Sequence, residues 1–265
     1  MKLVKAHAFG NDFLLVREQD LPHGIDRALL TSRLCERHRG IGADGVIFFN
    51  EETDVRDGVR MHLLNADGSF SEVSGNGVRC LAAWVAVSRD ARPGQIVNVD
   101  TDAGRKALEL LSRDGPRLTF RAAMGLPEQI QRRSIDVGGT AIDAVTLRVG
   151  NPQCVVLGEV SEERLHAVAA RLAVHPVFPA GSNVELAQVE APGRVRILIW
   201  ERGVGPTEAS GTGACAAAVA AIAYGGAARD VQVVSPGGAQ RVEWTDAGLF
   251  LTGWAEVLFE ARWMV

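Results

Sequence analysis

The stretch EVSGNGVRC (residues 72–80) returns in altered form as EASGTGAC (residues 208–215). Both copies read Glu-x-Ser-Gly-x-Gly and lead into an apolar run that predicts a helix. Ser74 and Ser210 hold the same place in the two copies, and a predicted strand and turn precede each one. One strand-turn-helix element is therefore used twice, which predicts two similar halves.

Short strands rich in Val, Ile, Leu and Phe dominate the rest of the chain, bounded by Gly, Asp, Asn or Pro. The fold class is therefore α+β. Helices are expected at 26–37, 76–88, 162–172 and 212–224. The halves are expected at 1–118 and 119–257, with the last segment, 258–265, returning to the first half.

Composition limits the class of protein. The chain has 265 residues, 47% hydrophobic and 23% charged, with a net charge of −4, which is typical of a globular protein and argues against a nucleic-acid partner. The four cysteines form no CxxC pair and show no zinc spacing, so no metal is expected. The N-terminal residues lack signal-peptide character and the longest apolar run, 214–223, is too short to cross a bilayer. These patterns predict a cytoplasmic protein with no membrane partner.

The repeated phrase has a physical use. The first N–H groups of a helix lack partners within the helix, and the helix dipole adds positive potential there, so such an end binds a carboxylate or phosphate. Two such ends facing one another would form a cleft with Ser74 and Ser210 on opposite walls. For either copy alone, a simple N-cap serine explains the pattern; the duplication favours a shared functional site.

Several motifs occur in a fixed order along nearly the whole chain. They are GNDF (10–13), RHRGIGADG (37–45), NADGS (65–69), SGNGVRC (74–80), GNPQC (150–154), HPVFP (175–179), SNVE (182–185) and WERGVG…SGTGAC (200–215). Together they resemble the diaminopimelate epimerase family, and the ERGVG…SGTG segment is the most specific of them.

The resemblance implies two pseudo-symmetric halves, each a curled, mostly antiparallel sheet around a central helix, with the active site in the cleft between them. It implies a cofactor-independent epimerase that interconverts L,L- and meso-diaminopimelate by two-base proton transfer in lysine and cell-wall precursor synthesis, as a cytoplasmic homodimer acting on a small amino acid. The implied substrate contacts are Asn11, Asn65, Asn151, Asn183, Glu201 and Arg202, with the helix-start residues Gly75, Asn76, Gly211 and Thr212. In this reading Glu201 takes the substrate ammonium and Arg202 the distal carboxylate.

The sequence departs from the family where its two catalytic cysteines belong, because Ser74 and Ser210 stand there. A thiol has an ordinary pKa of ~8.5 and an alcohol is far less acidic, so a serine needs an activating base. Glu72 and Glu208 are candidate partners but are more readily explained as polar or capping groups. Cys80 and Cys215 lie too far into the helices to substitute and are expected in the core. Gln153 replaces the family's commoner histidine.

The serines leave four accounts open. A natural branch could retain epimerase activity with serines, or the cysteines were engineered to serine to trap a ligand. The chain could instead bind amino acids without turning them over, or catalyse a related racemase or hydroxyproline-type dehydratase reaction. Proton exchange at the α-carbon distinguishes turnover from binding alone.

Overall fold

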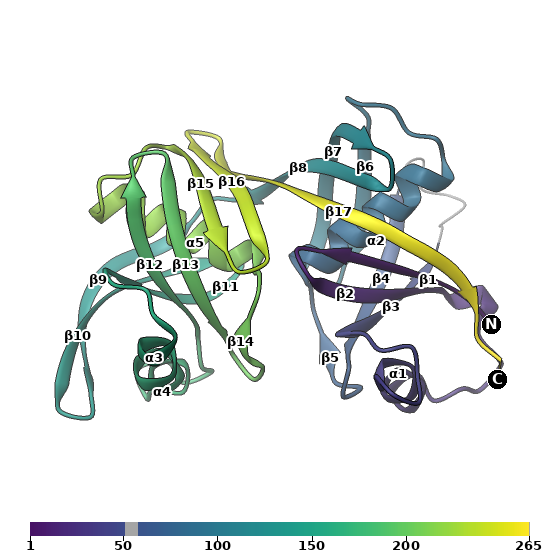
Figure 1. The fold of residues 1–265 in the computed structure, drawn as a ribbon, viewed down its shortest axis with the longest axis horizontal. Coiled ribbons are helices and arrows are strands. Elements are labelled where there is room, and N and C mark those ends of the chain that lie inside the picture. The colour runs from purple at the N-terminus through teal and green to yellow at the C-terminus, as the bar shows by residue number, and fades with distance from the viewer. Residues whose placement is uncertain (51–57, 265) are drawn as a thin grey trace. The chain divides into compact units, whose positions relative to one another are not determined.

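The computed structural model describes residues 1–50 and 58–264, and within them backbone hydrogen bonds connect 17 strands (Figure 1). The chain divides into two compact units, one containing Met1–Ala122 and the C-terminal segment from Gly253, the other Ala123–Thr252. The expected boundaries at residues 118 and 258 fall inside strands β8 (Arg117–Gly125) and β17 (Gly248–Arg262). Each of these strands continues without a break from one unit into the other.

The first unit winds its sheet around one helix. Its strands pair in the order β17, β1, β2, β3, β4, β6, β7, β8, and β8 pairs again with β17. The pairs β2–β3 and β4–β6 are parallel, and the other registered pairs are antiparallel. Its further elements are β1 (Lys2–Ala8), β2 (Asn11–Arg17), β3 (Gly45–Asn50), β4 (Gly58–Asn65), β5 (Phe70–Ser71), β6 (Ile96–Thr101), β7 (Gly104–Asp114), the 3-10 turn Glu18–Asp20, α1 (Arg27–Cys35) and α2 (Gly75–Ser88).

The second unit repeats this plan. The order β10, β11, β12, β13, β15, β16, β17 carries its parallel pairs at β11–β12 and β13–β15, the places that correspond to β2–β3 and β4–β6. The pseudo-symmetric fold expected from the repeated phrase is therefore present. Its further elements are β9 (Glu128–Val137), β10 (Thr140–Val149), β11 (Asn151–Leu157), α3 (Glu162–Arg164), a π-helical turn (Leu165–Ala169), α4 (Ala170–Ala173), β12 (Asn183–Ala191), β13 (Arg194–Glu201), β14 (Gly205–Thr207), α5 (Gly211–Tyr224), β15 (Asp230–Ser235) and β16 (Gly238–Thr245).

Helices α2 and α5 lie within the hydrophobic cores of their units. In α5 the run from Gly213 to Ala221 is buried without interruption, so every face of the helix packs against protein. Its partners include Val145, Val155 and Ile197 from the surrounding strands. Alanine at most of these helical positions lets the strands approach closely. Figure 1 shows α5 among the strands of its unit and α2 among those of the other.

The expected core cysteines are confirmed, because all four cysteines are buried. The helix expected at 162–172 is present but interrupted, since the π-helical turn separates α3 from α4. No helix within the described ranges is long and apolar enough to span a bilayer.

Candidate active site

Ser74 is the N-cap of α2. Its backbone is extended (φ −125°, ψ 124°), and its Oγ accepts a hydrogen bond from the Gly77 N–H at 3.1 Å. The hydroxyl therefore lies at the positive end of the helix, where negative charge on oxygen is stabilised. A Cβ at Gly77 would lie 3.1 Å from Ile47 Cδ1, so the first turn rests directly on strand β3.

Ser210 holds the same position on α5. Its Oγ accepts a hydrogen bond from the Gly213 N–H at 3.1 Å and lies 3.4 Å from the Thr212 hydroxyl. Ser210 is 7% exposed, and the buried Gln240 side chain donates to its carbonyl oxygen at 3.5 Å. Both serines are thus placed at helix starts, as the sequence predicts.

The two helix starts differ in their second residue. The Asn76 side chain is buried, where its Nδ2 donates to Asn11 Oδ1 at 3.3 Å and its Oδ1 accepts from Arg79 Nη1 at 3.1 Å. Thr212 is only half-buried and its hydroxyl faces Ser210. Gly75 and Gly211 are the first residues of their helices, so their N–H groups are among those without partners inside the helix.

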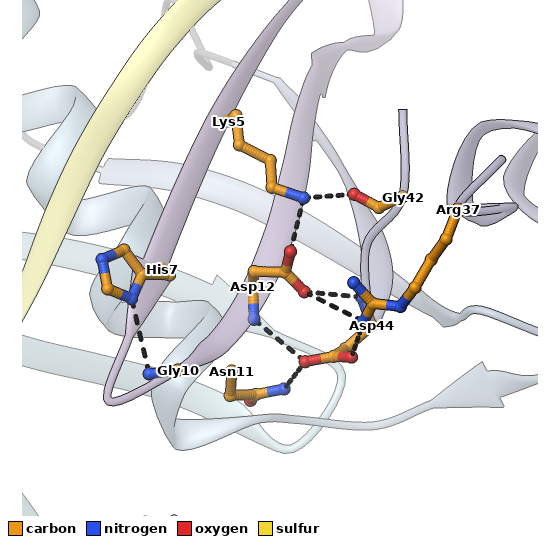
Figure 2. Close-up of polar contacts among 8 residues, drawn as sticks. All are labelled: Lys5, His7, Gly10, Asn11, Asp12, Arg37, Gly42 and Asp44. Carbon is orange, nitrogen blue, oxygen red and sulfur yellow. Dashed lines mark hydrogen bonds and ion pairs between the residues drawn. The ribbon is translucent and has the colours of Figure 1, made fainter. Parts of the chain in front are cut away.

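A polar network fixes Asn11 at the start of β2 (Figure 2). Asn11 Nδ2 donates to Asp44 Oδ2 at 2.8 Å, and the Asp12 N–H donates to the same oxygen at 3.0 Å. Arg37 Nη2 donates to the other Asp44 oxygen at 3.0 Å. Lys5 binds the Asp12 carboxylate and the Gly42 carbonyl oxygen, which anchors the inner end of this network. Asp44 therefore sets the orientation of the Asn11 amide.

Asn65 closes a tight turn at the end of β4. Its N–H donates to the Ser69 carbonyl at 2.8 Å and its Nδ2 to Ser69 Oγ at 3.0 Å. The neighbouring Gly45 has no room for a side chain, because a Cβ there would lie 2.7 Å from the Leu64 carbonyl oxygen. The turn therefore holds Asn65 beside the start of β3, with which it pairs.

In the second unit, the candidate residues gather at strand ends. Asn183 Oδ1 accepts from the Arg202 N–H at 2.9 Å, which ties the start of β12 to the residue after β13. Arg202 is exposed, and its guanidinium donates to the Ala180 carbonyl oxygen at 2.7 Å. Asn151 accepts from Gln153 Nε2 at 2.6 Å, and Glu201 is half-buried at the end of β13.

Glu185 is a residue whose importance the sequence reading missed. It lies on β12, is completely buried, and neither of its carboxyl oxygens has a hydrogen-bond partner among the described residues. Burial, and then the nearby Glu201 charge, raise the pKa of Glu185 well above its ordinary value, which favours the neutral form of the carboxyl. The available signal was an acidic residue at an inward position of an apolar strand.

Glu72 and Glu208, the serine partners considered from sequence, are both exposed. No group of three or more His, Cys, Asp or Glu side chains that could hold a metal ion occurs in the described part of the chain.

A cavity of about 350 Å³ in the second unit is lined by β9, β10 and the 177–181 loop. Gln153 also lines it, but Ser210 and Glu201 do not.

Known proteins resemble the chain in both sequence and fold. The diaminopimelate epimerase family profile matches residues 3–129 and 145–258. Diaminopimelate epimerase from Desulforudis audaxviator is 40% identical over 283 residues, covering 100% of this chain and 99% of that protein. The Heliobacterium modesticaldum enzyme of the same name is 36% identical, covering 99% of each.

Solved structures share the fold at much lower identity. A hydroxyproline epimerase from Agrobacterium vitis superposes with a TM-score of 0.71 at 18% identity, covering 98% of this chain and 91% of that one. A probable proline racemase from Agrobacterium radiobacter gives a TM-score of 0.72 at 17% identity, covering 100% and 93%. At these identities the likeness concerns the fold alone.

Proposed function

The chain belongs to the diaminopimelate epimerase family, and on that premise we propose that it is a cofactor-independent isomerase interconverting L,L- and meso-diaminopimelate. This reaction serves lysine and cell-wall precursor synthesis. The observation that carries the proposal is the matched pair of N-cap hydroxyls, Ser74 on α2 and Ser210 on α5, in a chain that matches named epimerases over its full length.

The proposed chemistry uses the two serines on opposite faces of one α-carbon. One serine, as its alkoxide, takes the α-proton as the C–H bond breaks and becomes a hydroxyl; the other serine gives its hydroxyl proton to the opposite face as the new C–H bond forms and becomes the alkoxide. The helix-start N–H groups of Gly75, Asn76, Gly211 and Thr212 bind the substrate α-carboxylate, which stabilises the negative charge that develops there. Protons move only between side chains and substrate, so the proposal requires no cofactor.

The remaining contacts bind the two ends of the substrate. Glu201 binds an ammonium group and Arg202 a distal carboxylate, for which its guanidinium fork is suited. The amides are proposed as the other contacts: Asn11, Asn65, Asn151 and Asn183. The structure supports this assignment by holding Asn11 and Asn183 in fixed orientations through Asp44 and the Arg202 N–H.

The direct test of the proposal is α-proton exchange. Wild-type protein incubated with L,L- or meso-diaminopimelate in D2O is expected to replace the α-hydrogen by deuterium and to form the other isomer, followed by proton NMR. Substrate binding is measured in parallel by calorimetry. Binding without exchange above the buffer background would establish the alternative, an amino-acid-binding protein that does not turn over.

Removing Asp44 should weaken substrate binding. Asp44→Ala takes away the acceptor of the Asn11 Nδ2 group and the Arg37 ion pair, so Asn11 is held less firmly, although Asn76 still donates to its Oδ1. KM is expected to rise about tenfold with a smaller change in kcat, because a binding contact is loosened while the serines stay in place. Asp143→Ala, which removes an exposed ion pair with Arg132, is the control and leaves both constants unchanged. An unchanged KM in Asp44→Ala would exclude Asn11 as a substrate contact.

A cytoplasmic homodimer is also part of the proposal. Its basis is the family resemblance.

A further inference from the structure

The two units build their helix starts on the same pair of parallel strands. In the first unit Phe13 pairs with Gly45 and Leu15 with Ile47, where β2 meets β3. In the second, Gln153 pairs with Asn183 and Val155 with Glu185, where β11 meets β12. Each pair of strands lies under the first turn of the helix that its serine caps. Ile47 and Glu185 therefore hold equivalent positions.

These two equivalent residues differ in chemistry. A Cβ on Gly77 would lie 3.1 Å from Ile47 Cδ1, whereas a Cβ on Gly213 would lie 2.6 Å from Glu185 Oε1. The space beside Gly77 in the first unit thus holds the Ile47 methyl group, whereas the corresponding space beside Gly213 in the second unit holds the Glu185 carboxyl group. The two units therefore share the backbone arrangement but differ in whether the side chain next to the serine is apolar or polar.

The Glu185 carboxyl and the Ser210 hydroxyl both border the space beside Gly213, although the structure forms no hydrogen bond between them. The same Cβ position on Gly213 is 3.2 Å from Ser210 Oγ and 2.6 Å from Glu185 Oε1, so the two oxygens are separated by no more than the sum of these distances. Ser210 Oγ already accepts the Gly213 N–H, which leaves its hydroxyl hydrogen for a second group. The Thr212 hydroxyl at 3.4 Å is the competing partner.

A buried carboxyl without hydrogen bonds destabilises a fold, so its presence favours a functional role. The titratable groups that face Glu185 do not neutralise it. Glu201 on β13 is itself acidic, and the Cys154 thiol on β11 has its pKa raised to about 12 by burial and by Glu185. At the start of α5, the nearby polar side chains are Ser210, its N-cap, and Thr212, and neither carries a charge.

We propose that Glu185 is the proton-exchange partner of Ser210, and that Ile47 leaves Ser74 without an equivalent partner in that position. The inference rests on the proposed epimerase function. When Ser210 acts as base, Glu185 is in its ionised form: the α-C–H bond breaks, its proton goes to Oγ, and the hydroxyl proton moves to the Glu185 carboxylate, which becomes neutral. In the reverse direction, neutral Glu185 returns a proton to Oγ as the hydroxyl proton passes to the α-carbon. Glu185 is a positioning residue in this scheme, since it acts through Ser210.

The first test removes only the exchangeable proton. Glu185→Gln keeps the shape of the side chain but can neither take nor give this proton, so kcat is expected to fall at least about tenfold while KM changes by less than about twofold. The dependence of kcat on pH should also change, because the ionisation of Glu185 no longer contributes to it. Glu190→Gln, on the same strand but exposed, is the matched control and leaves both readouts unchanged. Wild-type kcat and a wild-type pH profile in Glu185→Gln would overturn the proposal.

Folding of this variant is checked by thermal unfolding at several pH values. The raised pKa means that the folded state holds the Glu185 proton after the unfolded state has lost it, so wild-type stability declines as pH rises above the ordinary carboxyl pKa. Glu185→Gln lacks that decline. Its Tm is therefore expected to equal or exceed that of the wild type at neutral pH, which separates lost activity from lost fold.

A second test does not need turnover. Carbon-13 NMR of the Glu185 carboxyl, assigned by its absence in Glu185→Gln, follows the titration directly. Ser210→Ala is expected to shift the midpoint by about half a pH unit or more, because it removes the coupled hydroxyl. Ser74→Ala, which removes the other N-cap hydroxyl, should not shift it. If the wild-type protein shows no α-proton exchange, the epimerase function is refuted, but this titration still tests whether Glu185 and Ser210 interact. An unchanged Glu185 midpoint in Ser210→Ala would refute the proposed coupling between these two residues.

Discussion

Replacing Ser74 and Ser210 together with cysteine is expected to raise the rate of α-proton exchange and epimerisation by about 10²- to 10⁴-fold. Each Oγ accepts a helix N–H at 3.1 Å, so a sulfur in its place lies at the positive helix end, where a thiolate is stabilised. The pKa of such a thiol falls towards neutrality, whereas that of a serine hydroxyl does not. Either single substitution should give a much smaller gain, because both faces of the α-carbon need a proton-transfer group.

The control for this pair is another N-cap serine. Ser161 Oγ accepts the Arg164 N–H at 3.3 Å at the start of α3, and Ser161→Cys should leave the rate unchanged. Rates are measured by proton NMR in D2O with both isomers of diaminopimelate. A double-cysteine variant no faster than wild type would show that the site serves another substrate.

Replacing Arg79 by methionine should destabilise the first unit by about 3 kcal/mol. Arg79 lies on α2, is 2% exposed, and donates to Asn76 Oδ1 at 3.1 Å. Its guanidinium lies 5.5 Å from the centre of the Phe9 ring, and a Cβ on Gly253 would lie 3.1 Å from it. Methionine retains part of the volume but leaves the buried Asn76 oxygen without this donor.

Hydrogen exchange of the α2 amides measures this loss locally, which avoids assuming that two units unfold in one step. Arg89→Met, at the exposed C-cap of the same helix, is the control and should change the exchange free energy by less than about 0.5 kcal/mol. A loss below about 1 kcal/mol in Arg79→Met would mean that the guanidinium is replaceable by apolar packing.

Local sequence patterns predicted the parts of the fold that depend on local chemistry. The repeated Ser-Gly-x-Gly phrase predicted α2 and α5 nearly to the residue, because an N-cap serine and an apolar run specify a helix within one segment. Strand β9 was not predicted. Its segment EQIQRRSIDV is mostly polar and exposed, and it becomes a strand by pairing with β10.

The same distinction explains the site. Ser74 and Ser210 could be predicted as candidate residues and as N-caps because a repeat is visible in the sequence and their capping bonds are local. Glu185 was missed because its character comes from distant neighbours: the absence of a side chain at Gly213 and the charge at Glu201. Burial of an acidic side chain is decided by tertiary packing, which alternation within β12 does not reveal. The same holds for Asp44, whose role depends on Asn11 and Arg37.

Strand β17 has a consequence for synthesis on the ribosome. Its last residues complete the sheet that the first residues begin, since Lys2 pairs with Arg262 and the Met1 amino group donates to the Trp263 carbonyl at 3.0 Å. The chain emerges from the ribosome N-terminal end first, so the edge of β1 that pairs with β17 has no partner until β17 has been synthesised. The unit whose synthesis begins first therefore closes after the other unit has been made, and until then the nascent chain carries an open strand edge at β1.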